Sequence, residues 1–336
     1  MSGPARGAVG RATAWFRRAL VTAFWNRAER RLRAPWRLTL GLLLFGVLGV
    51  LPGVVLSVLP GGRALSAPLA RLVGSPLGVT AATALLTVVG VALAGRFLDR
   101  RRFSDFGLHF DRDFRVELAV GLALGAGLQT LVFLVELGAG WLVVTGVGGA
   151  PGLGSALAAN LALFALVGVY EELLVRGYLL TNLLEGLSGV GPIGPRGGAA
   201  LAALGSAGVF GVLHAGNPSA TPVSVLTVSV AGLLFALAYL WTGDLAVPIG
   251  LHVAWNFFEG PVYGFPVSGV GTGPSVVAAG AVGPTAYTGG AFGPEAGLAG
   301  LLALLSGTAV LAAWVRSRRG GLGLAPGVET PDLRWR

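Results

Sequence analysis

The chain has 336 residues, of which 54% are hydrophobic and only 12% are charged, and its mean hydropathy is +0.76. Soluble domains carry roughly a quarter charged residues, so this composition excludes an ordinary soluble protein and indicates a polytopic membrane protein. Because cysteine is absent, a disulfide framework, a thiolate metal site and a cysteine nucleophile are excluded. The net charge of +9 comes from arginines that flank apolar runs, which is typical of membrane topology and not of nucleic-acid binding.

The N-terminal segment, residues 1–37, carries nine arginines among aromatic residues at roughly helical spacing. This pattern predicts a basic amphipathic helix on the cytoplasmic face of an anionic membrane, and the alternative is a flexible arginine-rich tail that only fixes topology. Residues 38–315 then predict an all-α transmembrane bundle of about eight spans, two of them short. The apolar runs are 38–59, 72–94, 116–137, 156–184, 198–214, 223–241, 245–258 and 298–315.

Arginine is distributed unevenly between the loops. The loop 96–115 holds six arginines, and further arginines precede the fifth run and follow the last, whereas the loops 138–154, 215–222 and 260–297 hold none. The positive-inside rule therefore predicts that both termini are cytoplasmic, with 316–336 as a cytoplasmic tail. Arg63 and Arg71, in the first external loop, are the exceptions.

The segment 260–297 is rich in Gly, Pro, Ala and Val and has no charged residue before Glu295. Its composition argues against regular helix but is too apolar for an ordinary disordered linker. We expect a re-entrant or capping loop packed on the bundle, and the alternative is a mere connector.

Three charged residues stand inside the fourth apolar run, in Glu171-Glu172-Leu-Leu-Val-Arg176. Each costs roughly 2.5–3.5 kcal/mol at the centre of a membrane helix, so the cluster predicts a functional site. Glu172 and Arg176 are four residues apart and can pair on one helix face. Glu171 is rotated by roughly 100° from Glu172 and lacks that partner, which makes it the candidate general base.

Two of the three histidines also lie in apolar runs. His214 follows Phe210 by four residues, and His252 precedes Asn256 by four. These groups can meet Glu171 only if their spans share one interior cavity. Glutamate and histidine can deprotonate a water while histidine and an amide stabilise an oxyanion, which predicts peptide or ester hydrolysis without a covalent intermediate. Glu171, His214 and His252 could instead bind zinc, although the HExxH arrangement is absent and the metal-free reading is preferred.

At these residues the chain resembles the CPBP family of intramembrane proteases, the CAAX prenyl endopeptidases and bacteriocin-processing enzymes also called the Abi family. The family's motifs are EExxxR, FxxxH and HxxxN/D. All three occur here in that order, as Glu171–Arg176, Phe210–His214 and His252–Asn256, within a catalytic core predicted at 156–258.

The resemblance implies an integral membrane endopeptidase of a prokaryotic cell membrane, acting on a membrane-embedded or membrane-associated peptide or protein. Glu171 and His214 would activate the water, while His252 and Asn256 would form the oxyanion site. Glu172 and Arg176 would support them. Substrate does not carry over, because prokaryotic members have diverse targets.

Two other classes of function also fit buried ionisable groups. A transporter or channel would need them along its pathway, although no inverted repeat or second ionisable cluster accompanies them in the sequence. A non-catalytic scaffold or immunity protein on the same fold would be expected to have lost a motif residue, and none is lost here.

Overall fold

A computed structural model of the chain describes residues 22–58, 74–188 and 193–329, together with positions 71, 190 and 333. Within these ranges, seven helical segments are long and apolar enough to cross a membrane, which confirms the predicted all-α membrane bundle. They are Ala34–Val55, Pro76–Asp99, Arg112–Gly138, Leu153–Ser188, Gly194–Leu213, Pro222–Thr242 and Leu298–Arg319.

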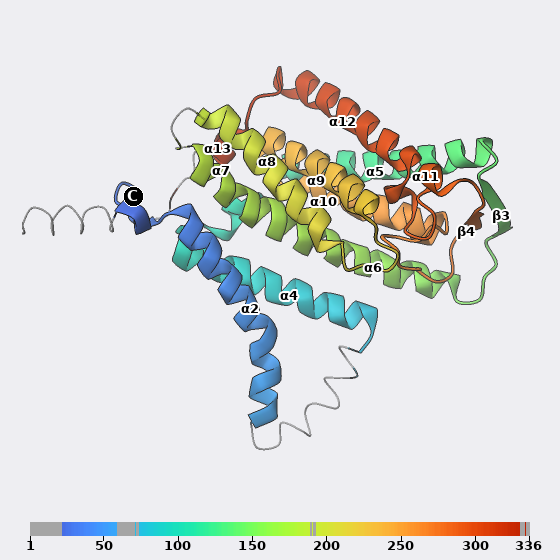
Figure 1. Cartoon of the computed structure of the whole chain (residues 1–336), viewed down its shortest axis with the longest axis horizontal. Helices are drawn as coiled ribbons and strands as arrows, with labels where there is room; N and C mark the ends of the chain where they lie inside the picture. Colours follow the sequence, from blue (N-terminus) through green and yellow to red (C-terminus); the bar gives the residue numbers. More distant parts are fainter. Residues whose placement is uncertain are drawn as a thin grey trace, which may run out of the picture.

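The bundle is built from α-helices with short π-helical and 3-10 continuations (Figure 1). The α-helices are α2 (Ala34–Val58), α4 (Pro76–Ala94), α5 (Arg112–Gly138), α6 (Leu153–Glu172), α7 (Thr181–Ser188), α8 (Gly194–Leu213), α9 (Pro222–Thr242), α10 (Ala246–Phe257), α11 (Thr285–Thr288), α12 (Leu298–Arg319) and α13 (Pro326–Glu329). The π-helical segments are η1 (Gly95–Asp99), η3 (Leu173–Leu180) and η5 (Phe258–Val262), and the 3-10 turns are η2 (Phe103–Phe106) and η6 (Pro294–Ala296).

The predicted N-terminal amphipathic helix lies mostly outside the described residues, which begin at 22. Residues 22–24 are helical, but β1 (Trp25–Asn26) then pairs antiparallel with β2 (Arg31–Leu32) in a short hairpin before α2. The helical prediction is therefore wrong for this hairpin. The hairpin places Arg31 in a buried position where it pairs with Glu185, which a helix lying on the membrane surface would not do.

The short run predicted at 245–258 does not form a span of its own. It becomes α10, which has 12 residues and is buried from Ala246 to Asn256. Glycines let α10 lie directly on α5: a Cβ at Gly125 would lie 2.5 Å from the Leu251 carbonyl oxygen, and one at Gly250 would lie 2.4 Å from the Leu118 carbonyl oxygen. This close backbone contact fixes the helix that carries the third motif.

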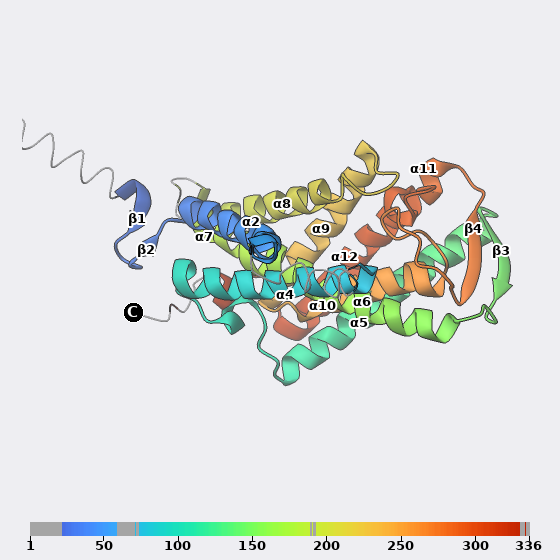
Figure 2. The same cartoon turned by 90° about the horizontal axis from the view of Figure 1, so that it is seen from below.

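The expected capping loop is present and packs on the bundle. Its strand β4 (Val277–Ala281) pairs antiparallel with β3 (Leu142–Val147), a two-stranded sheet that the sequence did not predict (Figure 2). Gly269 has φ +82° and packs so closely on Pro218 that a Cβ would overlap its carbonyl oxygen. The segment thereby covers the turn between α8 and α9.

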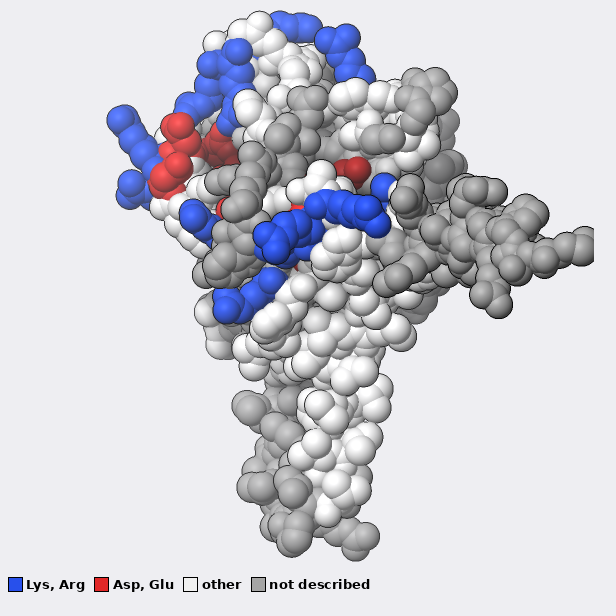
Figure 3. All heavy atoms as spheres, turned by 90° about the vertical axis from the view of Figure 1, so that its left-hand side faces the viewer, with Lys and Arg blue, Asp and Glu red and all other residues white. Residues whose placement is uncertain are grey.

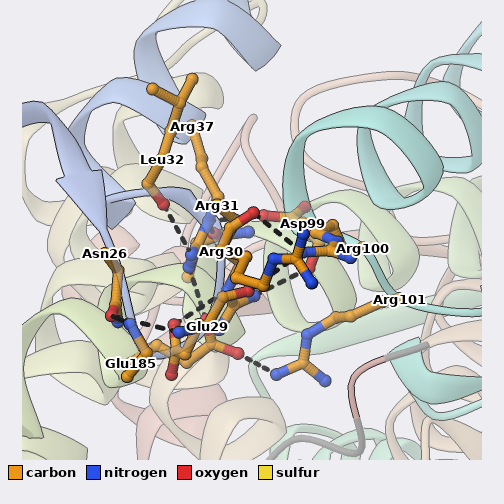
Figure 4. A network of polar contacts seen from close by, with 12 residues as sticks. Asn26, Glu29, Arg30, Arg31, Leu32, Arg37, Asp99, Arg100, Arg101 and Glu185 are labelled. Atoms are coloured by element: carbon orange, nitrogen blue, oxygen red, sulfur yellow. Dashed lines mark hydrogen bonds and ion pairs between the residues drawn. The ribbon is translucent and has the colours of Figure 1, made fainter. Parts of the chain in front are cut away.

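The opposite end of the bundle is held by a buried ion network. Glu185 of α7 pairs with Arg31 at 2.8 Å, with Arg37 at 2.5 Å and with Arg101, and Asp99 pairs with Arg37 at 2.7 Å (Figure 4). These residues come from β2, α2, η1 with the turn after it, and α7, so the network joins four segments. Many further arginines gather on the surface at this end (Figure 3).

The C-terminal segment after α12 returns to the same end of the bundle. Ala325 donates a backbone hydrogen bond to the Leu240 carbonyl, and Val328 is buried in the core. Nearby, His109 donates to Asp244 at 2.8 Å, and although burial raises the pKa of the Asp244 carboxyl, this hydrogen bond opposes the shift. At least part of the predicted cytoplasmic tail therefore packs against the helices.

Replacing Glu185 by Gln should strongly destabilise the protein, because it removes the carboxylate that pairs with Arg101 and one of the two that pair with Arg31 and with Arg37. We expect a loss of about 3–5 kcal/mol, as for breaking a buried ion pair. The control Glu29→Gln removes a half-buried partner of Arg31 and should cost under about 1 kcal/mol. The free energy of unfolding of each detergent-solubilised variant measures its loss of stability. Equal losses for the two variants would contradict a larger stabilising role for Glu185 than for Glu29.

Replacing Gly125 by Ala should force α5 and α10 apart, at a cost of about 1–3 kcal/mol typical of overpacking. Gly127 lies on the same helix and a Cβ there would meet nothing within 4 Å, so Gly127→Ala is the matched control. Thermal unfolding in detergent should show a lowered midpoint for the first variant only. An unchanged midpoint for Gly125→Ala would contradict the close backbone contact.

Candidate active site

The first motif lies where the long fourth helix changes its winding. Glu171 and Glu172 end α6, and the chain continues without a break into the π-helical turns of η3. Such turns are frequent at functional sites because they reorient side chains along a helix. The two carboxylates separate as predicted: Glu172 is fully buried, whereas the Glu171 side chain is 20% exposed and borders a cavity.

Glu172 is the centre of a buried hydrogen-bonded group. Its Oε1 accepts from Arg176 Nη1 at 2.8 Å, the ion pair that the spacing predicted, and from His252 Nδ1 at 2.9 Å. Arg176 also donates from Nη2 to the Gly232 carbonyl at 2.9 Å. The hydrogen bond to His252 was not predicted, because no helical spacing relates residues 80 positions apart.

Two phenylalanines enclose this group. The Arg176 guanidinium lies 4.3 Å from the Phe210 ring centroid and 5.1 Å from that of Phe235. The Phe235 ring also stacks on His252, with centroids 5.2 Å apart and planes 12° from parallel. Cation–π contacts and stacking therefore hold both the arginine and the histidine, which explains the phenylalanine of the second motif and adds Phe235, a residue that the sequence analysis missed.

A cavity of about 440 Å³ opens beside these groups. Its lining includes all four side chains for which a catalytic role was predicted, from α6, the end of α8, and α10: Glu171, His214, His252 and Asn256. Within it, Glu171 Oε2 lies 3.9 Å from His252 Nε2. Glu172 and Arg176 are absent from the lining, as expected for supporting residues.

The hydrogen bonds constrain the protonation of both histidines. His214 Nδ1 lies 2.8 Å from the Phe210 carbonyl oxygen, which can only accept, so Nδ1 carries the proton. In the neutral ring, His214 Nε2 is then an acceptor. His252 Nδ1 faces the Glu172 carboxylate, so it also carries a proton, and Nε2 is its remaining ring nitrogen.

Several other polar residues of the cavity were not predicted or were interpreted differently. Tyr170 donates to Glu171 Oε1 at 3.1 Å; its position next to the motif is the only sequence signal that could have identified it. Tyr178, further along the same helical segment, is buried away from the cavity and donates to the Arg37 carbonyl. Glu295, for which the sequence predicted no role in the site, lines the cavity and accepts from Ser268 at 2.6 Å.

A zinc site was the alternative use of Glu171, His214 and His252. Among the described residues, no three His, Asp or Glu side chains are placed to hold a metal ion. The three donors as placed therefore do not form a zinc site, and the metal-free chemistry stays a prediction.

Comparison with protein families agrees with the motifs. Residues 153–258 match the family model described as type II CAAX prenyl endopeptidase Rce1-like, nearly the same range as the predicted catalytic core at 156–258. No curated protein and no solved structure matches the chain. The resemblance to the CPBP family that the three motifs predicted is therefore confirmed for this central segment of the chain.

Proposed function

We propose that the protein is an intramembrane endopeptidase that hydrolyses a peptide bond with a water activated by Glu171 and His214. Its substrate would be a membrane-embedded or membrane-associated peptide or protein, of the CAAX type or a related prokaryotic kind. The observation that carries the proposal is the convergence of Glu171, His214, His252 and Asn256 on one cavity beside a buried ion pair. The Rce1-like match supports a CAAX-type intramembrane protease at the level of the family.

In the proposed reaction, the water donates a hydrogen bond to His214 Nε2, the ring acceptor, and gives its proton to Glu171. The resulting hydroxide attacks the carbonyl carbon of the scissile bond, and the carbonyl π electrons move to oxygen. Asn256 and His252 donate hydrogen bonds to this oxyanion. When the tetrahedral intermediate collapses, the C–N bond breaks and Glu171 returns the proton to the leaving amine.

The role of His252 as a donor requires its doubly protonated form, because Nδ1–H is occupied by Glu172. Charge balance supports this form. Glu171 and Glu172 contribute two negative charges, Arg176 contributes one positive charge, and an imidazolium at His252 makes the group neutral. Its Nε2–H, 3.9 Å from Glu171 Oε2, is then available to the oxyanion.

Transport and a non-catalytic scaffold are less well supported. Both need buried ionisable groups, but neither explains why a carboxylate, two oriented histidines and an amide border one cavity. The match to a protease family also favours hydrolysis. Arginines gather at one end of the bundle (Figure 3), and by the positive-inside rule this supports the proposal that both termini are cytoplasmic.

Replacing Glu171 by Gln removes the proposed base and should reduce cleavage by about 10²–10⁴-fold. Glu136→Gln is the matched control, because it makes the same substitution at a buried glutamate of α5 that does not line the cavity. Likewise His214→Ala should lose cleavage, whereas His109→Ala should not. A membrane-based peptidase assay with a peptide library measures all four, with unfolding in detergent as the check on folding. Full cleavage by Glu171→Gln would exclude the proposed mechanism.

Cleavage should survive exhaustive chelation, because the proposed chemistry needs no metal. Metal analysis of the purified active protein should find less than one equivalent of zinc. The control is a zinc peptidase treated identically, which should lose activity. Loss of cleavage on chelation, restored by added zinc, would refute the metal-free mechanism.

A further inference from the structure

The arginines of the described chain lie almost entirely at one end of the bundle. They occur at the hairpin and the start of α2, between α4 and α5, at the start of α8 and at the end of α12, and they crowd the end face seen in Figure 3. The exceptions are Arg176, which is buried in the site, and Arg71, which precedes α4. The positive-inside rule makes this arginine-rich end cytoplasmic.

The cavity borders the opposite end of the same helices. Its lining takes Pro76 from the first turn of α4, Asn160 from the second turn of α6, His214 from the C-terminus of α8 and Asn217 from the turn that follows. The capping segment adds residues 267–272 except Gly269. None of the lining residues described comes from an arginine-bearing helix end.

The mouth of the cavity can be located from exposure. Of the lining residues described, three are exposed: Pro76, Val270 and Gly271. One belongs to the start of α4 and two belong to the capping segment, so the opening lies between them. Toward the arginine-rich end, by contrast, the core next to the site is closed by buried side chains, including Leu173, Tyr239 and Leu245, each at most 1% exposed.

The lining also carries more negative than positive charge. Glu171 and Glu295 are acidic, His252 is the imidazolium of the proposed reaction, and no arginine is among the lining residues described. A free terminal carboxylate would therefore meet net repulsion, whereas a neutral or cationic segment would not. The apolar lining, which includes Phe164, Val167 and Leu304, suits a hydrophobic anchor.

We propose that the active-site cavity opens to the non-cytoplasmic side of the membrane and takes membrane-anchored polypeptides whose scissile bond lies on that side, flanked by neutral or cationic residues. The proposal rests on the proposed protease function for its substrate class, whereas its orientation does not depend on activity. It distinguishes this chain from an enzyme that receives carboxylate-terminated substrates from the cytoplasm.

The orientation can be tested with single cysteines, since the chain contains none. Val270→Cys reports on the mouth, Val282→Cys on the same end away from the cavity, and Ser317→Cys on the arginine-rich end; all three positions are exposed. In right-side-out membranes, a membrane-impermeant maleimide should label the first two cysteines and should label the third only after permeabilisation. The reverse pattern would overturn the orientation, and labelling at 282 without labelling at 270 would overturn the assignment of the mouth.

The substrate class can be tested with single-span model proteins that carry a short randomised segment on either side of the membrane. In cells with the wild-type protein, cleavage should occur on the non-cytoplasmic side and be lost with Glu171→Gln. Neutral or lysine-containing segments should be cleaved at least tenfold faster than segments with added Asp. Cleavage only on the cytoplasmic side would overturn the inference but support the proposed protease function. If the cysteines are labelled as expected and neither model protein is cleaved, the proposed substrate class is overturned and the result counts against the protease function.

Discussion

The site depends on one buried carboxylate. Glu172 sits at 0% exposure in a membrane bundle, where an unpaired charge would cost several kcal/mol, and it is tolerated because Arg176 and His252 both donate to the same oxygen. The same two hydrogen bonds fix the positions of α6, η3 and α10 relative to one another. The carboxylate that pairs with Arg176 therefore also orients the imidazole of His252 toward the cavity.

That arrangement requires α10 to lie deep in the bundle, and the surrounding structure meets this requirement in two ways. Glycines of α5 and α10 allow direct backbone contact, so the 12-residue helix is held without spanning the membrane. The capping segment then covers the turn after α8 through the Gly269–Pro218 contact and contributes Ser268 and Glu295 to the cavity. Burial of α10 and closure of the cavity by the cap are thus linked, because η5 joins the two.

The parts that the sequence predicted are those governed by local spacing. Apolar runs predicted the helices, and the four-residue spacing predicted the Glu172–Arg176 pair. The rotation between adjacent helical residues predicted the different direction of Glu171. The parts that it missed depend on contacts between distant segments: Glu172 with His252, Phe235 on His252, and β3 with β4. The hairpin at residues 25–32 was included in the predicted helix because the aromatic residues up to Trp25 have helical spacing, whereas a buried acidic partner on α7 decides where Arg31 lies.

The two buried ion clusters of the bundle have different consequences because their charges balance differently. At the arginine-rich end, the carboxylates of Glu29, Glu185 and Asp99 face the guanidinium groups of Arg31, Arg37 and Arg101, so the charges of this cluster balance among themselves. At the site, Arg176 balances the charge of only one of the two carboxylates. The charge of the second carboxylate is balanced only when His252 is protonated. The first cluster therefore anchors helices at a membrane surface, whereas the second leaves a carboxylate and an imidazolium facing each other across a cavity. In the proposed reaction, a water held by Glu171 and His214 gives its proton to Glu171, so the negative charge only moves and no new net charge is created inside the apolar bundle.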